Sequence, residues 1–209
     1  MTAPTSTKRE AAYGQDRELT AVDRLGVWLS GAAIRRRASF EGARFGDFGC
    51  GYEASFARTQ LPAARSAVLV DVALDPDLRS DPKVTAIEGW LPDVLSTVDG
   101  GSLDIVLCLS VLEHLWDADA ALAELFRVTA PGGVALINVP SWRGKRFLEL
   151  SAFRLGLSPR AEMDDHKRYY DPRDLWPMLV RAGFRPSGIR CHTHKGGLNT
   201  FAACRKEAR

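Results

Sequence analysis

The sequence predicts a single doubly wound α/β domain that ends in an antiparallel hairpin. Strand-like and helix-like segments alternate along most of the chain. The strand-like segments are almost continuously apolar, as is typical of strands buried on both faces of a parallel sheet. The length of 209 residues supports one substantial core rather than two full domains. Hydrophobic and charged fractions of 45% and 26% are those of an ordinary globular protein.

A disordered polar tail is expected at residues 1–15, followed by one domain over 16–209. The domain begins with an amphipathic helix over 16–37, in which apolar residues recur with a period near 3.6. The remaining elements then alternate in type. Strands are expected at 43–48, 66–72, 84–89, 103–109 and 133–139, and helices at 52–60 and 117–129.

The last part of the chain predicts a helix and a hairpin. Asp171 and Pro172 supply an N-cap and a first helical residue, and Gly183 supplies the C-terminal cap. Two strand-like runs follow, at 187–194 and 198–205, and a Lys-Gly-Gly turn separates them.

Charge and cysteine content limit the function classes. A net charge of +2 argues against a nucleic-acid partner. The four cysteines form no C-x-x-C pair, so neither a disulfide framework nor a zinc site is expected. The first residues lack an apolar signal core, and no run of 18 apolar residues occurs. We therefore expect a cytoplasmic protein without a transmembrane segment, and the sequence leaves its oligomeric state open.

The segment FGDFGCGYEASF, residues 45–56, has the pattern of a strand that breaks into a glycine turn and restarts as a helix. Gly49, Gly51 and Ala54 satisfy the dinucleotide fingerprint G-x-G-x-x-G/A. Such a turn indicates a nucleotide-bearing ligand at the carboxyl ends of the strands. The fingerprint alone does not distinguish a ligand with a pyrophosphate from one without.

Three features of the surrounding sequence favour a ligand without phosphate. Asp47 stands two residues before Gly49, where its carboxylate would repel a pyrophosphate and attract an ammonium group. Tyr52 and Glu53 crowd the helix N-terminus that a phosphate would need. Asp71 ends the second strand, where an acid can accept both ribose hydroxyls. S-adenosylmethionine meets these conditions. A nicotinamide cofactor is the competing interpretation, but the sequence lacks the Tyr-x-x-x-Lys pair that hydride chemistry would use.

Four ordered motifs carry a family resemblance: D-F-G-C-G at 47–51, the acid at Asp71, V-L-E-H-L at 111–115 and R-V-T-A-P-G-G at 127–133. Together they resemble class I S-adenosylmethionine-dependent methyltransferases over roughly residues 43–205. The chain is similar to the branch found with glycan, lipid and natural-product biosynthesis, whose late H-x-x-Y/F segment resembles the residues that begin at His166. The resemblance implies a Rossmann-like seven-stranded sheet with the last strand antiparallel.

The resemblance also implies roles for individual residues. The glycine turn would line the methionine part of the cofactor, and Asp71 would bind its ribose. Trp90 and Leu91 would form one side of the adenine pocket. The alternative for Trp90 is that it only packs against other side chains of the protein. Glu53 departs from the usual third glycine, and the usual acid after the third strand is missing. The expected cofactor-binding set is Asp47, Gly49, Cys50, Gly51, Asp71, Trp90, Leu91, Leu109 and Ser110.

Methyl transfer needs two reactants in line and, for a hydroxyl acceptor, a general base. His166 and His114 are the candidate catalytic residues, because His166 lies on the loop ahead of the last helix and His114 follows the fourth strand, both at the cofactor rim. The alternatives are a structural or substrate-binding role for His166 and a hydrogen bond at a helix start for His114. Glu113 and His114 resemble the pair in ubiquinone-type O-methyltransferases, where a metal-assisted hydroxyl is conceivable. Only these two ligands are adjacent in the sequence, so we expect no metal site.

A basic amphipathic segment at about 141–160 breaks the alternation and predicts a lid over the acceptor pocket. A helix packed on the core or a dimer contact is the alternative for this segment. The expected function is O-methylation of a sugar, a lipid-linked glycan or a specialised metabolite, with peripheral membrane contact left open. The alternative is a non-catalytic partner or regulatory protein with the same fold.

Overall fold

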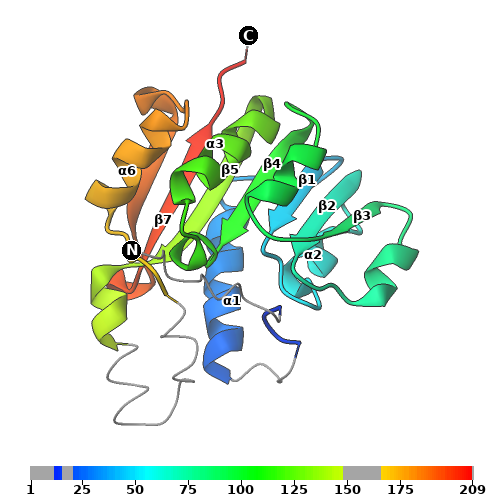
Figure 1. Cartoon of the computed structure of the whole chain (residues 1–209), viewed down its shortest axis with the longest axis horizontal. Coiled ribbons are helices and arrows are strands. Elements are labelled where there is room, and N and C mark those ends of the chain that lie inside the picture. The colour runs from blue at the N-terminus through cyan, green and yellow to red at the C-terminus, as the bar shows by residue number, and fades with distance from the viewer. Residues whose placement is uncertain (1–11, 16–20, 148–165, 209) are drawn as a thin grey trace, which may run out of the picture.

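The computed structural model describes residues 12–15, 21–147 and 166–208, and its centre is a mixed seven-stranded sheet between two layers of helices (Figure 1). The strand order is β3-β2-β1-β4-β5-β7-β6. This confirms the predicted doubly wound, Rossmann-like α/β fold. The strands are β1 (Arg44–Phe48), β2 (Ser66–Asp71), β3 (Val84–Glu88), β4 (Leu103–Leu109), β5 (Thr129–Pro140), β6 (Ile189–His194) and β7 (Asn199–Arg205).

Strand β7 is antiparallel to both of its neighbours, β5 and β6, whereas the pairs from β3 to β5 are parallel. Asn199 at the start of β7 lies opposite both Pro140 and His194, the last residues of β5 and β6. The turn between β6 and β7 therefore lies at the carboxyl edge of the sheet. Ligands bind at this edge in open α/β folds.

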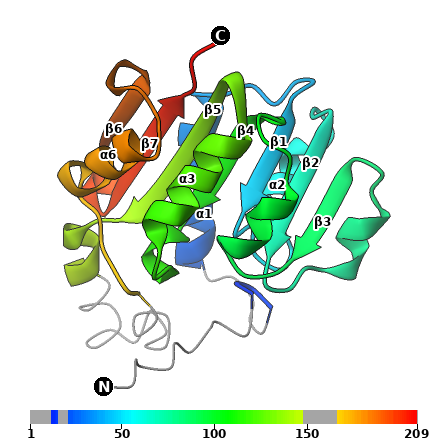
Figure 2. The same ribbon diagram turned by 45° about the horizontal axis from the view of Figure 1, so that its top comes forward.

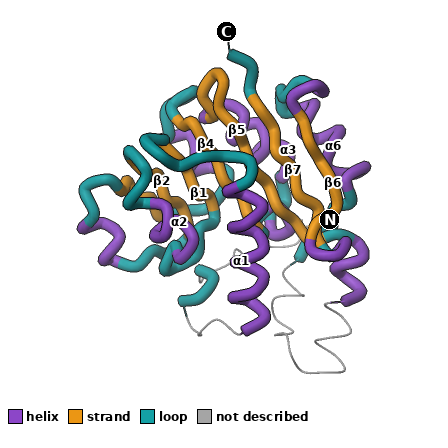
Figure 3. Tube along the Cα trace, turned by 180° about the vertical axis from the view of Figure 1, so that it is seen from behind, coloured by secondary structure: helices purple, strands orange, loops and turns teal. Residues whose placement is uncertain are grey.

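Helices cover both faces of the sheet. Helices α1 (Ala21–Arg35) and α2 (Ser55–Gln60) lie on one face, and α3 (Ala118–Val128) and α6 (Pro172–Arg181) lie on the other (Figures 2 and 3). Apolar strand residues alternate between the two layers, so the sheet is buried on both sides. Fully buried Phe45 and Leu107 pack in the α1 layer, and Phe48 and Val106 pack in the α3 layer.

Helix α6 confirms its predicted signals: Asp171 is the N-cap, Pro172 is the first helical residue, and Gly183 has a φ of +117° just past the end. Strand β5 begins four residues earlier than predicted, because Thr129 pairs with Leu103 before the register shifts. Five short 3₁₀ helices within the described residues were not predicted, since they are too short to show a 3.6 period. They span Pro76–Ser80, Asp93–Thr97, Leu112–His114, Pro186–Gly188 and Lys195–Gly197.

Two sequence-based expectations fall partly outside the described residues. Of the expected tail, residues 12–15 are described: Ala12 is buried, and the carbonyl of Tyr13 accepts a hydrogen bond of 2.9 Å from the Tyr52 amide. The remainder of the expected tail, residues 1–11, lies outside the described part. Of the expected lid, residues 142–147 are helical, and 148–160 lie outside it. Within the described ranges, no helix has the length and apolar character needed to cross a membrane.

Candidate active site

The glycine turn after β1 is held by backbone geometry that requires glycine. Gly49 and Gly51 have φ values of +81° and +77°, in the left-handed region that other residues avoid. A Cβ on Gly49 would overlap the side chain of Val111, so the turn and the segment after β4 are in direct contact. The Gly49 amide donates to the carbonyl of Val70 at 2.7 Å, which ties the turn to β2.

Asp71 connects the end of β2 to this turn. Its Oδ2 accepts a hydrogen bond of 2.8 Å from the Gly51 amide, and its Oδ1 accepts one of 2.8 Å from the Val72 amide. Asp71 thus fixes the turn at the edge of the sheet where ligands bind in open α/β folds. An ionised carboxylate in this place is the kind of group that accepts hydrogen bonds from ribose hydroxyls.

Asp47 is a buried carboxyl in the last part of β1, with 3% of its surface exposed. Burial, and secondarily the negative charge of Asp71, raise the pKa of Asp47 to about 7. Two carboxyl groups thus share a poorly solvated region at the mouth of the turn. A cation bound there would relieve their repulsion, in keeping with a sulfonium or ammonium ligand.

The remaining predicted cofactor residues lie around the same edge. Cys50 belongs to the turn, and burial is the main cause that raises the pKa of its thiol, so it is not a reactive thiolate. Trp90, after β3, is 47% exposed, and Leu91 packs partly on the core. Leu109 ends β4, and the exposed Ser110 follows with a φ of +57° and an amide bonded to the carbonyl of Asn138 at 2.7 Å.

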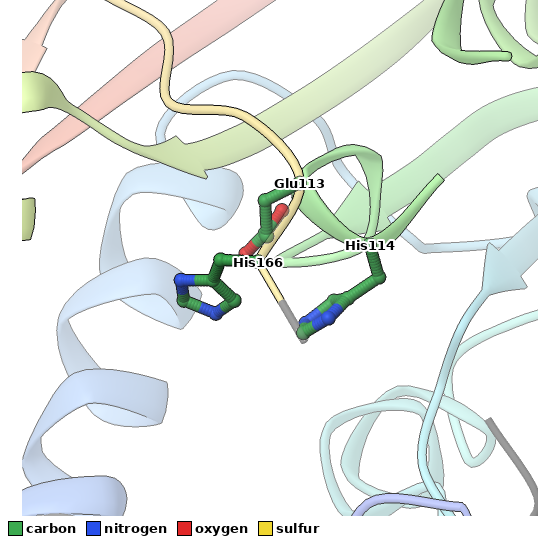
Figure 4. Close-up of side chains that lie close together, drawn as sticks. All are labelled: Glu113, His114 and His166. Carbon is green, nitrogen blue, oxygen red and sulfur yellow. The ribbon is translucent and has the colours of Figure 1, made fainter. Parts of the chain in front are cut away.

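Both predicted catalytic histidines lie in one cluster with a buried carboxylate (Figure 4). Glu113 and His114 belong to the short helix after β4, and His166 belongs to the segment that leads to α6. One ligand atom from each residue lies within 4.8 Å of those of the other two, and the two imidazole rings are 4.8 Å apart. Backbone contacts bring the segments together, because the Lys167 amide donates to the carbonyl of Glu113 at 2.6 Å.

The structure adds residues that sequence reasoning did not assign. The Nδ1 atom of His166 lies 3.1 Å from the hydroxyl of Tyr169, and the ring of Trp142 lies 5.7 Å from that of Tyr169. Tyr169 fills the aromatic position of the H-x-x-Y segment, which was the available signal. Lys195 is the other addition: its charge acts on Glu113, and the turn that carries it gave no functional signal in the sequence.

The cluster and the glycine turn adjoin one another through the segment after β4. Val111 packs on Gly49, and Glu113 and His114 follow two and three residues later. Strand ends thus place a carboxylate-lined turn and an imidazole pair side by side at the carboxyl edge. The arrangement can bind a cationic nucleoside without phosphate and can remove a proton beside it. Glu113, His114 and His166 also form a donor set that could hold a metal ion.

Comparison with known proteins shows which proteins this chain is similar to. A family model described as a methyltransferase domain matches residues 28–186. A protein of Mycolicibacterium smegmatis named probable S-adenosylmethionine-dependent methyltransferase is 30% identical over 120 residues, which are 56% of this chain and 41% of that protein. A protein of Psychrobacter arcticus named ubiquinone biosynthesis O-methyltransferase is 30% identical over 100 residues, 46% of this chain and 38% of that protein.

Solved structures share the fold at lower identity. The Burkholderia thailandensis 1,6-didemethyltoxoflavin-N1-methyltransferase, solved with S-adenosylhomocysteine, is 18% identical and has a TM-score of 0.63. The match covers 89% of this chain and 80% of that one. The matches to this chain cover about two fifths of the length of the two relatives from Mycolicibacterium smegmatis and Psychrobacter arcticus.

Proposed function

Because this chain belongs to the class I S-adenosylmethionine-dependent methyltransferases, we propose that it transfers the methyl group of S-adenosylmethionine to a hydroxyl oxygen of an aromatic small molecule. The contact between the glycine turn and the segment carrying Glu113 and His114 is the observation that supports this most directly. Several relatives are named ubiquinone biosynthesis O-methyltransferase, which favours a ring hydroxyl. No relative reported above is named for a sugar or glycan, so the proposal takes the third expected class, a specialised metabolite, and specifies an aromatic one.

The proposed cofactor site uses the residues of the turn. Asp71 accepts the ribose hydroxyls, and the turn from Gly49 to Gly51 leaves room for the methionine part because its residues are small. Asp47 supplies negative charge near the cationic end. The cofactor brings an already activated methyl group, so the chain has to bind, align and exclude water.

The proposed acceptor site uses the histidine pair. His166 takes the proton of the acceptor hydroxyl, and Tyr169 orients its imidazole through the contact at Nδ1. His114 packs edge-on against His166, and Glu113 lies buried behind them. Trp142 and Tyr169 provide an aromatic wall against which a planar ring could pack.

A metal-assisted variant of the same reaction is the second candidate. The expectation of no metal rested on two adjacent ligands, and His166 provides a third within 4.8 Å. Two imidazoles and a carboxylate suit a divalent transition metal. In that case Glu113, His114 and His166 would hold the ion, and the ion would lower the pKa of the acceptor hydroxyl.

The test is transfer of labelled methyl groups from S-adenosylmethionine to a panel of catechols, with and without a chelator. Activity that survives chelation assigns the proton to His166, and activity restored only by a divalent metal assigns the three residues to a metal site. Calorimetric titration with S-adenosylhomocysteine runs in parallel. A protein that binds neither this ligand nor S-adenosylmethionine at millimolar concentration contradicts the proposal and favours the non-catalytic alternative.

A further inference from the structure

A positively charged hollow of about 870 Å³ lies at the carboxyl edge, beside the ends of β5 and β6. Its walls come from three segments: the helical residues 142–147, the start of α6 and the turn between β6 and β7. Among the described residues that line it, three are cations and one is a carboxylate. These are Arg143, Arg173, Lys195 and Asp171.

Hydrogen bonds fix the walls relative to one another. The Ser141 hydroxyl donates to the carbonyl of Gly197 at 2.6 Å, and the Ser141 amide donates to the carbonyl of Leu198 at 3.0 Å. The Gly144 amide donates in turn to the Ser141 hydroxyl at 2.9 Å. Ser141 thus joins the helix that carries Arg143 to the turn that carries Lys195. A site held in this way loses little ordering entropy when it binds a ligand.

The cations of the hollow have few charge partners among the described residues. Within the described ranges, no hydrogen bond or ion pair engages the side chain of Arg143 or of Lys195. Arg173 has only a long contact of 3.9 Å from its Nε to Asp174. The single lining carboxylate, Asp171, already accepts a hydrogen bond of 3.3 Å from the Trp142 amide. The residues that line the hollow therefore carry an excess of positive charge, and the guanidinium groups among them suit an oxyanion.

Lys195 connects this hollow to the candidate catalytic cluster. It lines the hollow, and its Nζ lies 3.7 Å from the position that a Cβ on Gly26 of α1 would take. Its charge also acts on Glu113 of the cluster. Lys195 is therefore a lining residue of the hollow whose charge is coupled to the segment that carries Glu113 and His114.

We propose that this hollow binds an anionic group, a carboxylate or a phosphate, carried by the methyl acceptor. Assigning the ligand to the acceptor rests on the proposed methyl transfer, whereas anion binding itself does not. The shared chemistry is an oxyanion held by Arg143, Lys195 and Arg173. Neutral acceptors of the same shape would lack this anchor.

The test is titration of the whole protein with sodium phosphate and with sodium benzoate at constant ionic strength, followed through the amide resonances of Gly196 and Gly197. We expect saturable shifts with at least one anion. Arg143→Gln and Lys195→Met should each weaken that binding about tenfold, as expected for a lost charge-assisted hydrogen bond. The matched control is Arg190→Gln on β6, which lies outside the hollow and should change nothing.

The tighter of the two anions identifies the group that the acceptor carries. Shifts that never saturate, or that are the same in Arg143→Gln, Lys195→Met and wild type, overturn the proposal. Calorimetric binding of S-adenosylhomocysteine to each variant separates this failure from others. A variant that still binds S-adenosylhomocysteine but no longer binds the anion supports the anion site. A wild-type protein that does not bind S-adenosylhomocysteine would instead contradict the proposed function.

A kinetic comparison tests whether the anion belongs to the acceptor. We expect 3,4-dihydroxybenzoate to be methylated with a kcat/KM at least about tenfold above that of its methyl ester if benzoate is the tighter anion. Arg143→Gln should abolish that preference, and Arg190→Gln should keep it. Equal kcat/KM values for acid and ester in wild type would overturn the assignment to the acceptor.

Discussion

The two halves of the carboxyl edge differ in charge and in how they are built. The half at β1 and β2 presents the carboxyls of Asp47 and Asp71, which lie on either side of the glycine turn. The other half presents imidazoles and cations from the segments after β4, before α6 and between β6 and β7, which lie up to 81 residues apart, from His114 to Lys195. The acidic half suits a cationic cofactor common to a family, and the basic half suits an acceptor particular to this chain.

The largest effect is expected in the basic half. His166→Gln should lower kcat for methyl transfer about 10²- to 10⁴-fold, because it removes the proposed base while keeping a polar side chain. Binding of S-adenosylhomocysteine should stay within about twofold of wild type, since the acidic half is untouched. Stopped-time assays with labelled methyl groups measure the first quantity, and calorimetry measures the second. His192→Gln on β6 is the matched control. A variant that loses cofactor affinity as well would show that the halves are not separate.

The next effect belongs to the acidic half. Asp71→Ala should weaken binding of S-adenosylhomocysteine about a hundredfold or more, because hydrogen bonds to a charged group contribute about 1.5–3 kcal/mol each. Asp71→Asn keeps the shape and should lose less. Circular dichroism checks that the turn variants still fold, since Asp71 also binds the Gly51 amide. Wild-type affinity in Asp71→Ala would remove the ribose role from this residue.

The contact between the halves gives a smaller effect, on stability. Gly49→Ala should lower the free energy of unfolding by about 2 kcal/mol, since alanine is strained at a φ of +81° and meets Val111. Urea denaturation measures the change. Adding Val111→Ala should restore part of the loss by making room, while the backbone strain remains. If the loss of unfolding free energy in the double variant equals the sum of the losses in the two single variants, the turn and the segment after β4 are not coupled.

The smallest effect is a pH dependence in the acidic half. The pKa of Asp47 is about 7 in the free protein, so the carboxyl is mostly neutral at pH 5.5 and mostly charged at pH 7.5. A bound cation favours the charged form, and affinity for S-adenosylmethionine should therefore rise about tenfold across this range. Calorimetry at both pH values measures the rise. Asp47→Asn should bind with the same affinity at both, and a flat wild-type profile would contradict the prediction.

The same division explains what the sequence could predict. The glycine turn and Asp71 were predicted because their spacing is local and each follows an apolar strand. The cluster was predicted only in part: His114 and His166 could each be placed at the rim, but their convergence depends on the Lys167–Glu113 backbone contact. Lys195 was read only as a turn residue, because its functional position follows from β7 lying between β5 and β6.

The reversed direction of β7 has a consequence for engineering. The hairpin that brings residues 195–197 to the ligand edge pairs strands that adjoin in sequence, and it requires no helical crossover. The hairpin can therefore be changed as a unit: its loop can be lengthened or its loop residues exchanged without affecting the pairing of the parallel strands. Substrate preference could then be diversified by exchanging a few residues near the C-terminus, with donor chemistry carried unchanged by the first half of the chain.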